Sequence, residues 1–208
     1  SKENKELTEH FFNSAYEKGD IYTKEIEQLF DEQKNIFLSD RFVKGECPSC
    51  GAKDQYGDAC EVCGKTYDAL DLKNPYSTLS NSEPVIKKSK HYFFKLNNFK
   101  EFLNETVSEI SNQDPIKEKL KEWFDSGLKD WDISRDEPYF GFKIPNEDSK
   151  YLYVWLDAPI GYLSSIKNWC NSNNIDFNDF LNETEIVHFR GTDIVYFEVV
   201  VWPASLIA

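Results

Sequence analysis

The sequence predicts a mixed α/β protein, in which a small metal-binding knuckle is joined to the helices and strands of a larger body. Three observations lead to this fold class. Four of the five cysteines stand in two Cys-x-x-Cys pairs. Apolar residues recur at helical spacing in some segments and in near alternation in others, so both helices and strands are expected. In the last third of the chain, strand-like and helix-like segments follow one another with short connections, which is typical of a parallel α/β layer.

The N-terminal segment is expected to form one helix and then short antiparallel strands. Residues 7–16 carry apolar side chains at the steps of an amphipathic helix, and Gly19 ends it. Residues 21–30 mix apolar and charged side chains in near alternation, and the polar stretch 31–35 separates them from the apolar residues 36–38. This pattern predicts two strands joined by a turn.

The cysteine pairs predict a metal site in a knuckle of about residues 43–66. Nine residues separate the pairs, and a glycine follows each of them: Cys47 and Cys50 with Gly51, and Cys60 and Cys63 with Gly64. Four thiolates suit tetrahedral Zn²⁺, and a site with no open position is structural rather than catalytic. The tight spacing favours zinc over an iron–sulfur cluster. Two disulfides are the alternative, which needs an oxidising compartment and leaves Cys170 unpaired.

The middle of the chain is expected to contain a loop, strands and two helices. The loop and the strands are expected at residues 77–84, 84–86 and 91–96. Asn98 and Glu101 have the spacing of a capping box, which would open a helix to about residue 110. Asp114, followed by proline, begins the next helix, and Gly127 ends it.

The last part of the chain carries the predicted parallel layer. Strands are expected at residues 139–144, 151–156 and 185–189, and helices at 160–169 and 194–208. His188 lies within the third strand and is expected to be a core residue. In a parallel sheet, the loops at the carboxyl ends of the strands carry the ligand chemistry. Here those loops are residues 157–162 and 191–193.

Aromatic and small residues at the first of these loops predict an apolar recess. Trp155, Pro159 and Tyr162 would form walls that suit a small apolar side chain. In the second loop, backbone at Gly191 could approach a ligand, and the Asp193 carboxylate could accept a hydrogen bond from an ammonium group or a ribose hydroxyl. The alternative is that the aromatic residues are ordinary core and that Asp193 only caps a helix.

Composition narrows the function classes. A net charge of −13 disfavours strong autonomous nucleic-acid binding, which depends on clustered Lys and Arg. No apolar stretch approaches the roughly 20 residues of a membrane helix, and no signal-peptide pattern is present. With free thiols, a cytoplasmic location is expected. The chain has no methionine and stops within an apolar, helix-like run, so we expect it to be a piece of a longer product.

Several segments together resemble the methionyl-tRNA synthetases, a family of class I aminoacyl-tRNA synthetases. Residues 40–45 followed by Cys-Pro-x-Cys, and 54–58 followed by Cys-Glu-Val-Cys-Gly, are similar to the connective peptide of the bacterial enzymes. The resemblance continues through residues 123–128, 131–136, 139–142, 153–162, 193–197 and 202–204. It covers essentially the whole chain, in the order of the family.

The resemblance implies a Rossmann-type catalytic domain split by a zinc-bearing insertion. Residues 1–135 would be this connective insertion, and residues 136–208 the second half of the catalytic domain. The implied activity is methionine–tRNA ligation, in which methionine is activated with ATP and transferred to tRNA. Methionine, ATP with Mg²⁺, and tRNA would be the substrates of the full-length enzyme, and structural Zn²⁺ its cofactor.

The resemblance also implies roles for single residues. Zinc would be held by Cys47, Cys50, Cys60 and Cys63. The methionine pocket would be lined or contacted by Trp155, Ala158, Pro159, Tyr162, Asp193, Ile194 and Trp202. Arg135 would face the active site, and it is the one candidate for a catalytic residue.

The chain departs from the family in two ways. The His-Ile-Gly-His and Lys-Met-Ser-Lys-Ser elements, which handle ATP, are not in it, so the isolated chain is expected to be inactive. Glu198 stands where the family usually has histidine, and Arg190 and Thr192 replace an apolar residue and a lysine. A buried carboxylate is costly unless it is paired or protonated, and Arg190 is a potential partner for Glu198.

Two alternatives from other classes remain. The chain could be a non-catalytic, zinc-stabilised interaction module or tRNA-docking module. It could also be one half of a split synthetase.

Overall fold

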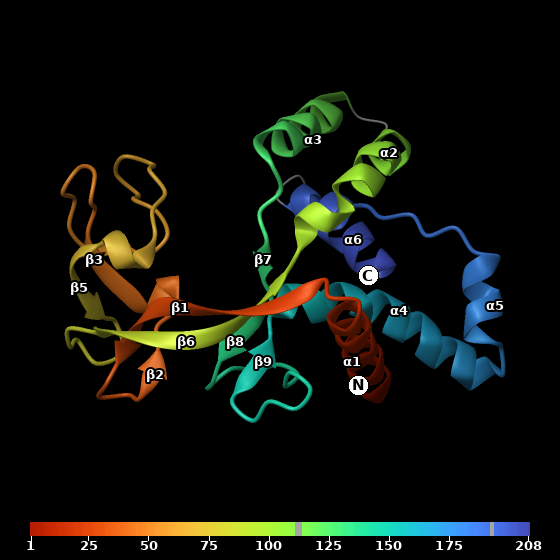
Figure 1. Ribbon diagram of the computed structural model, residues 1–208, viewed down its shortest axis with the longest axis horizontal. Helices are drawn as coiled ribbons and strands as arrows, with labels where there is room; N and C mark the ends of the chain where they lie inside the picture. The colour runs from red at the N-terminus through yellow and green to blue at the C-terminus, as the bar shows by residue number, and fades with distance from the viewer. Residues whose placement is uncertain (111–113, 192–193) are drawn as a thin grey trace. The chain divides into compact units, whose positions relative to one another are not determined.

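The computed structural model describes residues 1–110, 114–191 and 194–208 (Figure 1). Its chain divides into two compact units, which we call unit 1 (residues 1–23, 92–135 and 140–208) and unit 2 (residues 24–91 and 136–139). The units therefore do not follow the predicted division at residue 135. That division concerns family segments rather than compactness, and it stays a prediction.

Unit 1 begins with helix α1 (Lys2–Glu17), which confirms the first predicted helix. Ser1 caps it, because the Ser1 hydroxyl accepts a hydrogen bond from the Asn4 N–H at 3.3 Å. Gly19 follows the helix with a φ of +80°, a left-handed conformation that glycine adopts without strain. Helix α1 packs against helix α4 (Val154–Asn173), and the two lie side by side in Figure 1.

The predicted antiparallel strands are present. Strand β1 (Ile21–Asp31) pairs with β2 (Ile36–Phe37), and Phe30 stands opposite Phe37. The two short strands predicted within residues 84–96 form one continuous strand, β6 (Val85–Phe94), which pairs with β7 (Trp131–Asp132). The order in this sheet is β2-β1-β6-β7. Strands β1 and β6 each contribute residues to both units.

Unit 2 also holds a three-stranded sheet in the order β4-β3-β5. Its strands are β3 (Val43–Glu46), β4 (Gln55–Tyr56) and β5 (Lys73–Ser77). The accompanying core is small and consists of Leu29, Leu38, Val43 and Leu72. So few buried side chains stabilise a unit of this size weakly, which makes a further cross-link important for its fold.

Two helices follow β6, as predicted. Helix α2 (Lys100–Ile110) is preceded by a 3₁₀ turn (Leu96–Phe99), and α3 (Asp114–Ser126) ends before Gly127, whose φ is +87°. The predicted capping box at Asn98 is wrong. Asn98 lies inside the 3₁₀ turn, and its side-chain amide donates to Asp20 Oδ1 at 2.7 Å instead.

The C-terminal part differs most from the prediction. Strand β8 (Ser134–Asp136) pairs with β9 (Lys150–Leu152), but residues 139–144 and 185–189 are not strands. Helix α4 begins at Val154, so Trp155 and residues 157–162 lie on a helix rather than on a strand and its loop. A short aromatic and apolar run does not by itself distinguish a strand from a buried helix.

The predicted parallel layer is therefore not formed by these segments. Val187 and Phe189 are 63% and 89% exposed, and a strand needs a neighbour to pair with its backbone groups. The last predicted helix is confirmed, as a π-helical turn (Phe197–Val201) followed by α6 (Trp202–Ile207). A short helix, α5 (Phe177–Asn182), lies between α4 and this segment. The predicted class, with mixed helix and sheet, is confirmed.

Within the described residues, no helix is both long enough and apolar enough to cross a membrane.

Candidate metal centre and aromatic site

The two Cys-x-x-Cys pairs form two turns of the same shape. In the first, the Gly51 N–H donates to the Cys47 carbonyl at 3.0 Å, and in the second the Gly64 N–H donates to the Cys60 carbonyl at 2.8 Å. Both glycines have left-handed φ values of +73° and +70°, which explains why glycine follows each pair. The repeated turn directs both members of a pair toward the same point.

The four sulfurs converge on one small volume. Cys47 Sγ lies 3.9 Å from Cys63 Sγ, Cys50 Sγ lies 3.6 Å from Cys60 Sγ, and all four sulfurs lie within 4.8 Å of one another. All five cysteines are free, which contradicts the disulfide alternative. A tetrahedron with zinc–sulfur bonds of about 2.3 Å has edges of about 3.8 Å. The four cysteines could therefore hold a zinc ion.

The thiols of the cluster differ in acidity. Burial raises the pKa of Cys47, but backbone N–H groups of Cys50 and Ser49 and the neighbouring thiols outweigh this and lower it to about 6. For Cys50, the Ala52 N–H lowers the pKa, whereas burial and the other cysteines raise it to about 12. Four thiolates this close repel one another, and a divalent cation removes that repulsion. The donor set therefore suits a metal ion.

In unit 1, four aromatic side chains form what we call the aromatic site: Trp131, Tyr153, Trp155 and Phe197. Trp155 on α4 meets Phe197 edge to face, with ring centroids 4.1 Å apart. Phe197 also meets Trp131 at 5.1 Å, and Tyr153 stacks on Trp155 at 6.0 Å. Trp155 is 40% exposed, so one side of the site is open.

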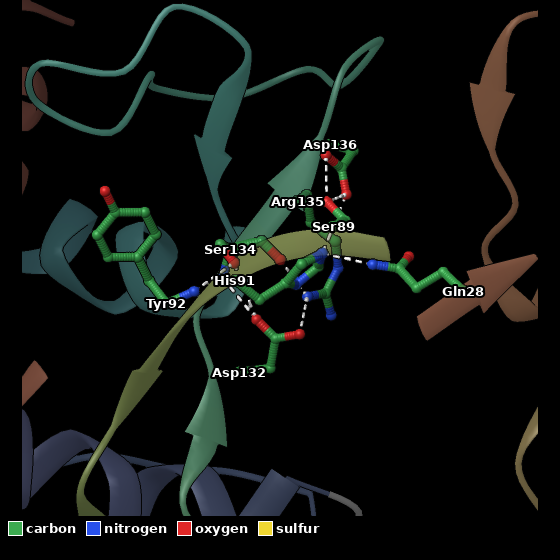
Figure 2. A network of polar contacts seen from close by, with 8 residues as sticks. All are labelled: Gln28, Ser89, His91, Tyr92, Asp132, Ser134, Arg135 and Asp136. Atoms are coloured by element: carbon green, nitrogen blue, oxygen red, sulfur yellow. Dashed lines mark hydrogen bonds and ion pairs between the residues drawn. The ribbon is translucent and has the colours of Figure 1, made fainter. Parts of the chain in front are cut away.

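Arg135 lies against this aromatic site. Its guanidinium carbon is 3.9 Å from the centre of the Tyr153 ring, a cation–π contact, and its Nη1 is 3.8 Å from Asp132 Oδ2. Figure 2 shows the Arg135 side chain beside Asp132. The stacking fixes a positive charge next to an open aromatic surface, whereas the catalytic role of Arg135 stays a prediction.

The other predicted pocket residues fall into three groups. Ala158, Pro159 and Tyr162 lie on α4, and Ile194 lies at the start of the last helical segment, none of them fully buried. Trp202 is only 8% exposed and stacks on Phe11 at 6.1 Å, so in this chain it is a core residue. Asp193 lies outside the described residues, as does Thr192.

Tyr162 contacts a charged group that connects α4 to the last helical segment. The Arg190 guanidinium carbon lies 4.6 Å above the centre of the Tyr162 ring, and Arg190 Nε donates to Glu198 Oε1 at 2.9 Å. His188 Nδ1 lies 3.4 Å from Glu198 Oε2. The pairing left open at the sequence level is therefore present. His188 is exposed, so its expected place in the core is wrong, because residues 185–189 are not a strand.

Sequence reasoning missed three members of the aromatic site as pocket residues: Trp131, Tyr153 and Phe197. The density of aromatic residues in 131–155 was the available signal. It also missed Asp157, a buried carboxyl in the first turns of α4. Burial raises the pKa of Asp157 to about 6, although its own backbone N–H opposes this.

Unit 2 contains a buried polar network around His91 (Figure 2). His91 Nε2 lies 3.0 Å from Asp136 Oδ2, the His91 ring also contacts the Gln28 amide, and Ser89 Oγ donates to Asp136 at 2.9 Å. Ser89 and His91 therefore both contact the Asp136 carboxylate. They bring residue 136 into unit 2.

A cavity in unit 1 lies apart from the aromatic site. It has a volume of about 590 Å³ and lies between Lys5 and Glu9 of α1 and the turn at residues 141–148. No predicted pocket residue lines it, and charges of both signs surround it. We assign it no role.

Comparisons with known proteins agree on one family. Residues 1–208 match the family described as tRNA synthetases class I (M). The methionine–tRNA ligase of Psychrobacter sp. (strain PRwf-1) is 53% identical over 225 residues, covering 99% of this chain and 32% of the ligase. That of Vesicomyosocius okutanii subsp. Calyptogena okutanii (strain HA) is 52% identical, covering 100% of this chain and 38% of the ligase.

A solved structure has the same fold. Mycobacterium tuberculosis methionyl-tRNA synthetase bound by methionyl-adenylate matches with a TM-score of 0.63 at 18% identity, over 100% of this chain and 36% of that one. The chain thus spans about a third of the length of the relatives it matches. The family match over every residue and the shared fold show that the chain belongs to the class I tRNA synthetases of the methionine type.

Proposed function

We propose that the full-length protein containing this chain is a methionine–tRNA ligase. It would activate methionine with ATP and Mg²⁺ and transfer it to tRNA. One observation carries the proposal: across its whole length, the chain is about half identical to proteins named methionine–tRNA ligase. Because the chain covers a third of those proteins, the proposal concerns the full-length protein rather than the isolated chain.

The aromatic site supports methionine as the amino acid. A thioether is polarizable and makes favourable contacts at the edges of aromatic rings. The open side of Trp155, with Phe197 behind it, offers such a surface. Ala158, Pro159 and Tyr162 would extend this surface along α4, and Ile194 would border it from the last helical segment, whereas Trp202, as a core residue, would support it from behind. Asp193 would contact the substrate ammonium group.

This chain contributes methionine binding and one candidate charged group, Arg135, to the reaction. It lacks the His-Ile-Gly-His and Lys-Met-Ser-Lys-Ser elements of the family, which supply the positive charge that adenylation needs. Arg135, fixed on Tyr153, is the candidate in this chain for stabilising negative charge near the aromatic site. We propose this role for it because a preorganised charge needs no reorientation during the reaction.

Zinc would act on folding. Cys47, Cys50, Cys60 and Cys63 would hold Zn²⁺ with no open position, which suits a structural ion. Such closure contributes on the order of 10 kcal/mol to folding in small metal-dependent modules. Free thiols in this cluster also agree with a reducing compartment such as the cytoplasm.

Substitutions at two tryptophans of α4 test the methionine site. In the full-length protein, Trp155→Ala should raise the KM for methionine at least tenfold in ATP–pyrophosphate exchange, because an aromatic wall is lost. Trp169→Ala is the matched control, since Trp169 lies on the same helix but packs on Phe180. An equal KM in both variants would contradict the proposed pocket.

A docking module remains the second candidate only if the isolated chain binds tRNA. The net charge of −13 disfavours tRNA binding by the isolated chain. A filter-binding titration of the isolated chain at rising salt is expected to show no tight complex. Submicromolar binding at physiological salt would favour the docking module.

A further inference from the structure

Gln55 occupies a particular place between the two cysteine pairs. It lies on β4, five residues after Cys50 and five residues before Cys60, and stands opposite Gly45 of β3. Its side chain is polar, yet the residue is only 7% exposed. A buried amide is retained at little cost only when its hydrogen-bonding groups have partners.

Both polar atoms of the Gln55 amide have such partners. One partner precedes β4 in the sequence, and the other follows it. Gln55 Nε2 donates to the Lys53 carbonyl at 2.7 Å, and Gln55 Oε1 accepts from the Glu61 N–H at 2.7 Å. A carbonyl can only accept and an N–H can only donate, so these contacts define the orientation of the amide. The side chain therefore connects the end of the first knuckle turn with the start of the second.

The second contact reaches the metal-binding turn itself. Glu61 stands directly after the ligand Cys60, and the Cys63 N–H points at Cys60 Sγ at 3.4 Å. Holding Glu61 in place fixes the backbone from which Cys60 and Cys63 project. The other pair is joined to Gln55 through residues 51–53, because the Ala52 carbonyl accepts from the Cys47 N–H at 2.8 Å.

We propose that Gln55 is a positioning residue of the metal centre, which sets the distance between the two cysteine pairs. It would act through the backbone rather than by touching the ion. Groups outside the ligand shell commonly have this effect, and their loss weakens metal binding by about 10- to 100-fold. The inference goes beyond the proposed function, since it concerns the affinity and geometry of the site whatever the enzyme's substrate is.

The chemistry of these two hydrogen bonds favours glutamine at position 55. Glutamate has the same shape, but it offers a carboxylate oxygen to the Lys53 carbonyl, where acceptor meets acceptor. It also adds a negative charge on β4, between the two cysteine pairs in the sequence. Alanine removes both hydrogen bonds. Gln55→Glu is therefore the sharper change, because it leaves no cavity.

The test uses Co²⁺ as the probe, bound to the 208-residue chain and titrated against a chelator of known affinity. Gln55→Glu and Gln55→Ala should each bind Co²⁺ 10- to 100-fold more weakly than the unchanged chain. Gln33→Glu is the matched control with the same change of charge, placed at an exposed position in the turn between β1 and β2. Its affinity should stay within twofold.

The visible spectrum of bound Co²⁺ separates positioning from a general loss of stability. If Gln55 sets the distance between the pairs, the variants should show weaker absorption bands of the tetrahedral ion, because the tetrahedron is distorted. All five tryptophans lie in unit 1, so an unchanged tryptophan emission spectrum would verify that unit 1 is still folded.

Each outcome decides the inference. Affinities within twofold of the unchanged chain would overturn it, and so would weaker binding with an unaltered cobalt spectrum, which would reduce Gln55 to a contributor to stability. Complete loss of binding in Gln55→Glu, with Gln33→Glu normal, would support it, because that change keeps the shape of the side chain. None of these readouts depends on aminoacylation, so they leave the proposed function untouched.

Discussion

All four cysteines of the candidate metal centre come from one stretch, residues 47–63. The aromatic site instead draws its residues from strand β7, the start of α4 and the last helical segment. The knuckle is complete within unit 2, and two short turns direct its sulfurs. The aromatic site exists only after unit 1 has folded, and Trp155 stays partly open. From this difference we expect the fold of the knuckle to depend on a bound metal ion, and the aromatic site to depend on the packing of its helices.

The largest effect is expected from removal of the metal. Cys60→Ser, or a strong chelator, should remove on the order of 10 kcal/mol of folding free energy from the knuckle, residues 43–66. Unit 1 has its own core, so its helices should keep their protection. Hydrogen exchange measured by mass spectrometry would follow both regions at once. Equal loss of protection in α1 and in the knuckle would contradict the separation.

Glycine substitutions sharpen the comparison at the level of packing. Alanine at Gly57 would place its Cβ 2.8 Å from Val43 Cγ1 and 3.0 Å from Ala69 Cβ, so Gly57→Ala should cost about 1–3 kcal/mol. Gly161→Ala in α4 meets nothing within 4 Å and should stabilise the helix by about 0.5–1 kcal/mol. Thermal unfolding of the metal-loaded chain measures both. An unchanged melting temperature in the Gly57→Ala variant would show that the side chains around Gly57 are packed less tightly than described.

The Arg190–Glu198 pair should couple more strongly than an exposed pair. Glu198 has only 11% of its side chain exposed, so a double-mutant cycle with alanine should give a coupling of about 1 kcal/mol. The Lys119–Glu122 pair on α3, with half or more of each side chain exposed, should give about 0.3 kcal/mol. Denaturant unfolding followed by tryptophan emission suits both cycles, since all tryptophans lie in unit 1. Equal coupling energies for the two pairs would contradict the partly buried Arg190–Glu198 ion pair beside Tyr162.

The two units should respond to pH with opposite signs. Burial raises the pKa of Asp157 to about 6, so the folded state binds more protons than the unfolded state between pH 4 and 6, and the stability of unit 1 falls as pH rises through this window. At Asp31 in unit 2, burial would raise the pKa, but hydrogen bonds from Ser77, Ser80 and the Lys34 N–H lower it to about 2.

Asp31 therefore stabilises unit 2 above its unfolded pKa, and this contribution is lost as pH falls from about 4 to 2. Asp157→Asn should make the stability of unit 1 less dependent on pH between 4 and 6. Asp31→Asn should do the same for unit 2 between pH 2 and 4. Hydrogen exchange of each unit at pH 3, 5 and 7 tests both signs. An Asp157→Asn variant with an unchanged pH dependence would exclude the buried carboxyl as the cause.

Sequence reasoning succeeds where the determining residues are close in the chain. The spacing of Cys47, Cys50, Cys60 and Cys63 predicts their meeting, because each turn needs only its own glycine. The helix α1 and the pair β1–β2 follow from local periodicity in the same way. The start of α4 cannot be predicted from local periodicity, because an aromatic run from Tyr151 onward suits a strand as well as a helix.

Contacts between distant segments are the part that local patterns do not contain. Residues 185–189 have the composition of a strand, but among the described residues no strand pairs with them, and they are exposed. Phe197 enters the aromatic site because a π-helical turn brings it to Trp155. The sequence offers Arg190 as a potential partner for Glu198, but only the folded structure shows that the two side chains form an ion pair.

Amino-acid-dependent ATP–pyrophosphate exchange by the full-length protein tests the central claim most directly. With a panel of amino acids, we expect exchange that depends on methionine and is much weaker with leucine, isoleucine and valine, and none from the isolated 208-residue chain. Exchange that prefers another amino acid, or undiminished exchange from the isolated chain, would contradict the account.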